Sequence, residues 1–126
     1  MLTREVLIAA TLIVLVTVGM VQTWGYDQVG IASWYGPGFH GQHASNGEIY
    51  DMHEMTAAHK SLPFDTIVKV VDLESGNTVV VRITDRGPFI PGRVIDLSKA
   101  AAQELEIIDT GTARVGLKVL RWPSEN

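Results

Sequence analysis

The sequence has no cysteine among its 126 residues. A disulfide and a thiolate site are therefore excluded, and no cysteine is present that could carry the lipid of a lipoprotein. Lys and Arg number 10 against 14 Asp and Glu, for a net charge of −4. The basic residues do not cluster, which argues against nucleic acid as a partner. No cofactor motif, internal repeat or low-complexity segment is found.

The longest apolar run covers residues 6–21 and follows Arg4. This pattern predicts an N-terminal hydrophobic helix that acts as an export signal or a membrane anchor. Cleavage and retention both stay open, and a helix buried in the domain is the third reading. We expect residues 1–25 to form this segment and residues 26–126 to form one monomeric domain in the cell envelope, with membrane contact only through the N-terminal segment.

The remaining pattern is that of a small β protein with frequent glycine, 12 residues in all. Alternating and β-branched runs predict strands, and Ser98 is a typical N-cap for one short helix. Strand closure removes unpaired edges, which favours a barrel. We predict a linker at 26–28, strands at 29–35, 66–73, 78–84, 93–97 and 113–119, a long loop at 36–58 and a helix at 99–107.

Asp85 is the first candidate for chemistry. It follows the strand-like run 79–83 and precedes Gly87-Pro88, which ends a strand. A carboxylate at the tip of a rigid strand suits general acid/base catalysis. An ordinary turn aspartate is the alternative.

Two further acids, Glu48 and Asp51, stand in the long loop. If this loop folds over the tip of the 78–84 strand, three carboxylates converge, and like charges raise the pKa of at least one of them. That acid would then carry a proton near neutral pH, as cleavage of a glycosidic bond requires. Without convergence, Glu48 and Asp51 are solvated loop acids.

The histidines give a weaker signal. His40-x-x-His43, with His53 and His59, matches no standard zinc spacing, so we assign no metal site. His59 or His40 is the better candidate for a polar group in the cleft, and solvated loop histidines are the alternative.

Aromatic and cationic side chains flank the same segments. An exposed ring beside carboxylates suits a sugar, although most aromatic rings are buried in cores. Trp34 and Tyr35 point to opposite faces of a strand, so one of them is available. Arg86 should contact Asp96 or the ligand if Asp85 is to donate a proton, because a nearby cation lowers a carboxyl pKa. The aromatic candidates are Trp34, Tyr35, Phe39, Tyr50, Phe64 and Phe89.

Six ordered blocks together resemble the rare lipoprotein A family of bacterial cell-wall proteins, over about residues 29–120. They are Ala32-Ser33-Trp34-Tyr35-Gly36, Phe39-His40-Gly41, Ser45-Asn46-Gly47-Glu48-Ile49-Tyr50-Asp51-Met52, Thr56-Ala57-Ala58-His59-Lys60-Ser61-Leu62-Pro63-Phe64, Val80-Val81-Arg82-Ile83-Thr84-Asp85-Arg86-Gly87-Pro88-Phe89 and Arg93-Val94-Ile95-Asp96-Leu97-Ser98.

The resemblance implies a six-stranded double-psi β-barrel with one or two short helices. It also implies a lytic transglycosylase that cuts peptidoglycan glycan strands without water and leaves 1,6-anhydro ends. By the family motif Asp85 is the general acid/base and Glu48 and Asp51 are supporting acids. His59 matches a polar residue of the cleft, where we also expect Trp34, Tyr35, His40, Arg86 and Phe89 to bind substrate.

Three departures and two alternatives accompany this resemblance. The founding members carry a lipid-anchoring cysteine and a C-terminal peptidoglycan-binding domain, and here the cysteine is missing and the sequence ends at Asn126. Asp65 and Glu106 stand where we expect glycine, in surface turns. A binding module without turnover, as in expansins, and a hydrolase with the same barrel are the alternative functions.

Overall fold

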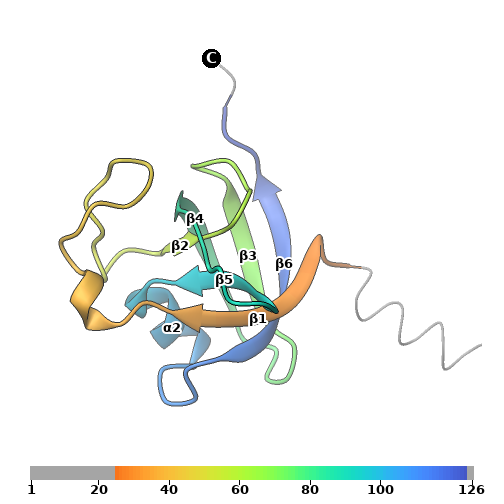
Figure 1. Cartoon of the computed structure of the whole chain (residues 1–126). Helices are drawn as coiled ribbons and strands as arrows, with labels where there is room; N and C mark the ends of the chain where they lie inside the picture. Colours follow the sequence, from red (N-terminus) through yellow and green to blue (C-terminus); the bar gives the residue numbers. More distant parts are fainter. Residues whose placement is uncertain (1–24, 125–126) are drawn as a thin grey trace, which may run out of the picture.

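The computed structural model describes residues 25–124, so the predicted N-terminal helix and its assignment as signal or anchor lie outside the described residues. The described part is a barrel with one α-helix and one 3₁₀ helix (Figure 1). Its elements are β1 (Gln28–Trp34), η1 (Pro37–Phe39), β2 (Thr56–Ala58), β3 (Ile67–Asp72), β4 (Thr78–Asp85), β5 (Arg93–Leu97), α2 (Lys99–Leu105) and β6 (Ala113–Arg121).

The six strands close into a barrel, as the sequence predicts, and their order around it is β1-β5-β2-β4-β3-β6. The pairs β1–β5 and β2–β4 are parallel, and the other four pairs are antiparallel. Residues of β3 alternate between half-buried and buried, which is the period-two pattern seen in the sequence. The interior is filled by apolar side chains of the strands and of α2, among them Val68, Val81, Ile83, Ile95 and Leu117.

Strand β2 is the element that the sequence pattern did not predict. It is three residues long, and the predicted loop 36–58 includes it. It lies between β4 and β5, and Ala58 pairs with Asp85 on one side and with Asp96 on the other. This short strand therefore brings two aspartates of distant sequence to the same end of the barrel.

Residues 26 and 27 are not a linker, contrary to the sequence prediction. The Asp27 backbone N–H donates to the Leu117 carbonyl at 2.8 Å, and the Asp27 carboxylate accepts from the Val119 N–H at 2.8 Å. The Tyr26 ring packs so closely on Gly116 that a Cβ there would lie 2.5 Å from it. The packed unit thus begins before β1, against strand β6.

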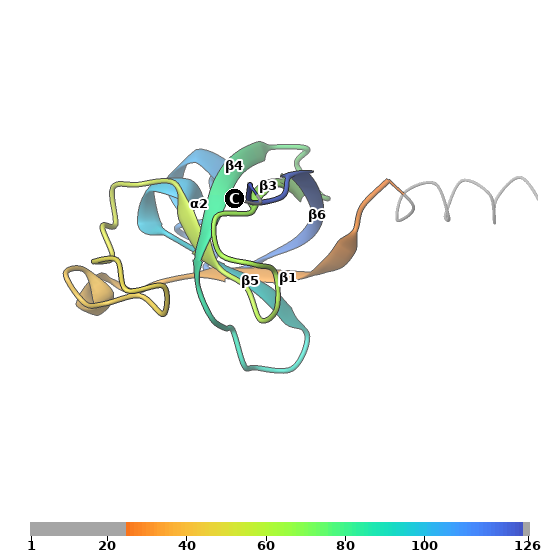
Figure 2. The same ribbon diagram turned by 90° about the horizontal axis from the view of Figure 1, so that it is seen from above.

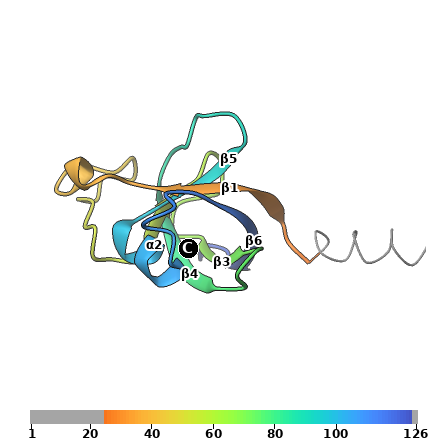
Figure 3. The ribbon, with the colours of Figure 1, turned by 90° about the horizontal axis from the view of Figure 1, so that it is seen from below.

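Two connections project from the barrel. Figures 2 and 3, which view the chain from above and below, show the segment between β1 and β2 on one side and the segment between β4 and β5 on another. Gly87 opens the second connection with φ +124°, a conformation that L side chains rarely adopt. The backbone can therefore turn away immediately after β4, which leaves Asp85 at the strand end.

Other local predictions can be checked directly. Ser98 caps α2 by accepting a hydrogen bond from the Ala101 N–H at 3.2 Å. Asp65 and Glu106 have φ of 72° and 64°, so both occupy turns where glycine is usual, as expected. No helix within residues 25–124 has the length and apolar character needed to cross a bilayer.

Candidate active site

An open cleft of about 340 Å³ lies between the end of β1, the start of the β4–β5 connection and β5. Its lining includes two carboxylates, Asp85 and Asp96, together with Tyr35 and Arg93. Of the site residues proposed from the sequence, the cleft contains Asp85, Trp34, Tyr35, Arg86 and Phe89. Glu48, Asp51, His59 and His40 are not among its lining residues.

Asp85 is held by hydrogen bonds from three distant segments and from its neighbour Arg86. Its Oδ1 accepts from the Ser45 N–H at 3.0 Å, from the Ser45 hydroxyl and from the Arg86 N–H at 2.8 Å. Its Oδ2 accepts from the Tyr35 hydroxyl at 3.0 Å. Its backbone carbonyl accepts from the His59 N–H at 3.1 Å. Strand β4 and these donors fix the carboxylate in one orientation.

These donors also set the charge of Asp85. Burial by itself raises the pKa of this carboxyl, but the hydrogen bonds from Ser45, Arg86 and Tyr35 outweigh burial and bring the pKa below its ordinary value. Asp85 is therefore ionised near neutral pH in the unliganded protein. The expected rise in its pKa from converging acids is wrong, because donors surround it instead.

Tyr35 is a fixed donor to Asp85. Its ring lies 5.0 Å from the Tyr50 ring in an edge-on arrangement and 5.5 Å from the Phe39 ring. Burial raises the pKa of the Tyr35 hydroxyl, and the charges of Asp85 and Asp96 raise it further. The hydroxyl therefore stays protonated and donates a hydrogen bond to Asp85.

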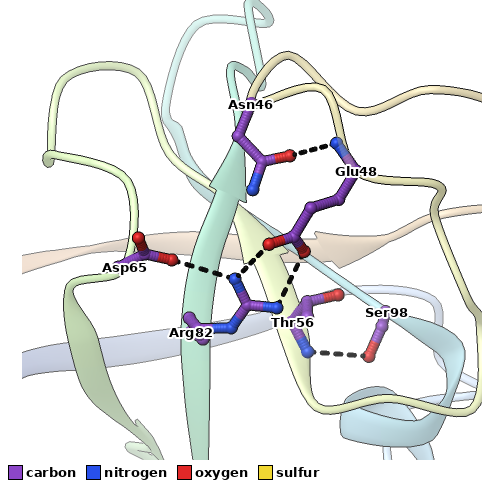
Figure 4. Close-up of polar contacts among 6 residues, drawn as sticks. All are labelled: Asn46, Glu48, Thr56, Asp65, Arg82 and Ser98. Carbon is purple, nitrogen blue, oxygen red and sulfur yellow. Dashed lines mark hydrogen bonds and ion pairs between the residues drawn. The ribbon is translucent and has the colours of Figure 1, made fainter.

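Glu48 lies outside the cleft and pairs with an arginine (Figure 4). It belongs to a small hairpin, residues 41–50, in which the Gly41 N–H donates to the Tyr50 carbonyl and the Ala44 N–H to the Glu48 carbonyl. The Arg82 guanidinium binds both oxygens of Glu48, at 3.0 and 2.8 Å. The hydrogen bond from Arg82 lowers the Glu48 pKa.

The loop folds over the tip of β4, which was the condition for convergence, but the three acids do not share the cleft. Asp51 follows the 41–50 hairpin, and its Oδ1 accepts from the His53 N–H at 2.9 Å. Glu48 is occupied by Arg82. The sequence pattern placed the loop correctly and missed the cation that takes the charge of Glu48.

His59 is a buried residue behind the cleft, with 5% of its surface exposed. Its Nδ1 accepts from the Ser61 and Leu62 N–H groups at 3.1 and 3.0 Å, so its proton resides on Nε2, 2.7 Å from the Gln28 Oε1. Burial lowers the His59 pKa, and the charges of Arg86 and Lys60 lower it further. In this structure His59 contacts the backbone around Asp85 and does not face the cleft.

The other histidines lie in the exposed loop. The His40 Nδ1 accepts from the Met52 N–H at 3.2 Å, and its ring lies 5.8 Å from the His53 ring. Within residues 25–124, no group of three or more His, Cys, Asp or Glu side chains is placed to hold a metal ion.

Arg86 supports the backbone near the cleft. Its guanidinium donates to the carbonyls of His59 and Leu62 at 3.2 and 2.8 Å and stacks on the Phe64 ring at 4.0 Å. The expected contact with Asp96 is not formed. Because the Arg86 guanidinium donates to backbone carbonyls, it forms no ion pair with Asp85 or Asp96.

Exposed aromatic rings edge the cleft. Phe89 is 79% exposed and Phe39 is 52% exposed, while Trp34 is half-buried and packs against the core. Phe89 and Asp85 line the same cleft, so the cleft offers an open ring together with a carboxylate. This arrangement suits a ligand with both apolar faces and hydroxyl groups.

Two residues of the site escaped the sequence prediction. Ser45 provides two of the donors to Asp85, and only tertiary structure brings this loop residue to the end of β4. Asp96 lines the cleft on β5 and accepts a hydrogen bond from the Ser33 hydroxyl on β1. A lone acid in the apolar strand 93–97 is the signal that would have singled out Asp96.

Comparison with known proteins adds relatives of close sequence. The family described as lytic transglycolase matches residues 27–117. The endolytic peptidoglycan transglycosylase RlpA of Campylobacter jejuni is 56% identical over 97 residues, which cover 77% of this chain and 35% of that protein. RlpA of Pseudomonas aeruginosa strain PAO1 is 55% identical over 100 residues, 77% of this chain and 29% of that protein. The chain thus spans about a third of the length of these relatives.

Solved structures with similar folds include the Streptomyces papain inhibitor, with a TM-score of 0.60 and 23% identity over 76% of this chain and 97% of that one. An expansin from Clavibacter michiganensis has a TM-score of 0.59 and 22% identity over 77% of this chain and 52% of that one. Both are double-psi β-barrels, so the predicted fold is confirmed.

Proposed function

The chain belongs to the lytic transglycolase family, and on that premise we propose that it is an endolytic peptidoglycan lytic transglycosylase. The substrate is the peptidoglycan glycan strand, cut between N-acetylmuramic acid and N-acetylglucosamine. The muramic acid 6-hydroxyl displaces the leaving sugar, which yields a 1,6-anhydro end. The protein acts in the cell envelope as a monomer, without a cofactor. The carboxylate of Asp85, held at a strand end in an open cleft, is the observation that carries this proposal.

Asp85 is the residue that we propose exchanges protons with the substrate. Its hydrogen bonds favour the ionised form before substrate binds, and an ionised carboxylate can accept the proton of the 6-hydroxyl as a general base. A fixed base aligned with its substrate contributes about 10²–10⁴-fold to the rate.

The leaving sugar also needs a proton, because an alkoxide is a poor leaving group. Asp96 is the second carboxylate in the cleft, and among the described residues it accepts a hydrogen bond only from Ser33. We assign the proton donation to Asp96. The proton passes from Asp96 to the glycosidic oxygen as the bond to C1 breaks, and the 6-hydroxyl oxygen bonds to C1 as its proton passes to Asp85. Asp85 then releases its proton to solvent and Asp96 takes up a proton from solvent, which returns both groups to their starting states.

A binding module without turnover is the second candidate. The open rings of Phe39 and Phe89 beside the cleft favour it, because they offer sugar-binding surface whether or not a bond is cut. Such a protein would hold glycan strands and release no product.

Digestion of purified peptidoglycan separates these functions. Glycan strands with and without stem peptides are incubated with the full chain, and the products are analysed by mass. Anhydro ends support the transglycosylase. Reducing ends would show a hydrolase, and binding without products would show the second candidate.

A further inference from the structure

The contact between the 41–50 hairpin and strand β4 has two parts. At its tip, Ser45 donates from its N–H and its hydroxyl to the Asp85 carboxylate, and the Asn46 N–H donates to the Thr84 carbonyl at 3.2 Å. At its return arm, Glu48 pairs with Arg82, three residues before Asp85 on the same strand. The hairpin is thus fastened to β4 on both sides of its turn.

Arg82 is a rigid anchor for this contact. It lies inside the sheet, where it pairs with Ile67 of β3 and with Thr56 of β2, and its N–H donates to the Met55 carbonyl at 3.1 Å. Its guanidinium takes both oxygens of Glu48 and also donates to Asp65 at 2.9 Å (Figure 4). A two-pronged arginine–carboxylate pair fixes direction as well as distance.

The turn itself transmits this constraint to Ser45. The Asn46 side chain accepts from the Glu48 N–H at 2.9 Å, and the Gly47 N–H donates to the Ala44 carbonyl at 3.0 Å. Only two residues separate Ser45 from Glu48, and these bonds leave the turn little freedom. The position of the Glu48 carboxylate therefore determines where Ser45 lies.

We propose that Glu48 is a positioning residue whose ion pair with Arg82 holds the two Ser45 donors on the Asp85 carboxylate. Glu48 touches neither the cleft nor Asp85 and acts through the hairpin. This inference deepens the proposed function, on which it rests for the role of Asp85. It assigns Glu48, which the family resemblance gives as a supporting acid of the site, the task of holding the hairpin in place. When the ion pair is lost, the hairpin is held to β4 at its tip alone, and the Ser45 donors that favour the Asp85 anion are less firmly placed.

Several polar and charged groups near Asp85 also affect its pKa. Tyr35 donates to it, Asp96 and Arg93 of β5 share its cleft, and the Arg86 guanidinium and buried His59 lie on the side of the 59–62 backbone. None of them belongs to the hairpin, although the Tyr35 ring packs on Tyr50 at the end of its return arm. Removal of the Glu48 charge alone would lower a neighbouring carboxyl pKa, whereas loss of the Ser45 donors raises it. A direct charge effect of Glu48 and a positioning effect through Ser45 therefore predict shifts of the Asp85 pKa in opposite directions.

The test is a carboxyl NMR titration of Asp85 in the full chain, with the variants Ser45→Ala, Glu48→Gln and Asp65→Asn. Asp65→Asn is the matched control, since it removes the other acid bound to Arg82 and leaves the hairpin pair intact, and asparagine accepts the positive φ of this position. We expect the midpoint of Asp85 to rise by about 1 pH unit in Ser45→Ala and in Glu48→Gln, and to stay in place in Asp65→Asn.

Activity gives the second readout. The acid limb of kcat/KM for release of anhydro ends should move to higher pH in the same two variants, and the double variant should shift less than the sum of the single shifts. A fall or no change of the Asp85 midpoint in Glu48→Gln would overturn the inference, as would an equal shift in Asp65→Asn. Because the NMR titration needs no turnover, absence of anhydro products from the unaltered chain would count against the proposed function alone.

Discussion

Asp85 accepts hydrogen bonds from four donor groups, whereas Asp96 accepts one, from Ser33, within the described part of the chain. The two carboxylates of the cleft thus have different hydrogen-bond surroundings, which suits the separate roles that we propose for them. The strand-end position and Gly87-Pro88 made Asp85 predictable from the sequence. Its ionised state was not, because three of its donors come from residues 40 and 50 positions away.

The assignment of Asp96 as proton donor leads to a prediction about leaving groups. Asp96→Asn should slow the release of anhydro ends from glycan strands by about 10²–10⁴-fold. On a muramic acid glycoside with a nitrophenolate leaving group, which needs no proton, the loss should be far smaller. Rates on both substrates are measured by product mass and by absorbance.

Asp109→Asn is the control for this comparison, since Asp109 is exposed and is not among the cleft residues. Equal losses for Asp96→Asn on both substrates would contradict the role of Asp96 as the acid.

His59 predicts a pH dependence of stability. Its pKa in the folded protein lies below the ordinary value, so the unfolded chain binds the proton more readily. Its contribution to the free energy of unfolding is therefore complete above the unfolded pKa of about 6.5 and is lost as pH falls from there toward the folded pKa. His59→Asn keeps an acceptor for the Ser61 and Leu62 N–H groups and cannot titrate.

Thermal unfolding at several pH values checks this expectation. His59→Asn should cost about 1–3 kcal/mol at pH 7.5, because contacts of the ring are lost, and its unfolding temperature should fall less below pH 6.5. His53 is exposed, so the His53→Asn variant should show the same pH dependence of the unfolding temperature as the unaltered chain. An unchanged pH dependence in His59→Asn would show that another group is responsible.

At the scale of elements, the sequence pattern predicted the long strands but neither β2 nor the contact between β6 and the residues before β1. Strand prediction succeeded where alternation is long, as in β3 and β6, and failed for β2, whose three residues carry no measurable period. The packing of Tyr26 on Gly116 also could not be read from the sequence, since a glycine in a strand has several explanations. The sequence predicted most of the loop 36–58, in which the structure places η1 and, at its end, β2.

Gly116→Ala tests this contact. The new Cβ would lie 2.5 Å from the Tyr26 ring, so the ring must move, and we expect a loss of about 1–3 kcal/mol in the free energy of unfolding. Urea unfolding of the full chain provides the measurement. Gly38→Ala is the matched control, because nothing lies within 4 Å of its Cβ position.

Tyr26→Ala then identifies the origin of the loss. Alanine at 116 should cost little more in a chain that already lacks the ring, so the two changes should not be additive. Additive losses would show that Gly116 is required for another reason.

At the scale of the whole molecule, the closed barrel explains how the two carboxylates of the cleft come together. Strand order places β2 between β4 and β5, and this arrangement brings Asp85 and Asp96 to one end although they lie on separate strands. The sequence predicted the barrel and its family from ordered motifs. It did not predict which acids meet, because that depends on strand register and on the competing cation Arg82.

The most direct measurement is the rate at which Asp85→Asn releases 1,6-anhydro ends from purified peptidoglycan, compared with the unaltered chain. Asparagine keeps the shape of the side chain and removes its ability to take a proton. Our account predicts anhydro ends from the unaltered chain and a rate at least about 100-fold lower from the folded variant. Release of anhydro ends by Asp85→Asn at the original rate would contradict the account.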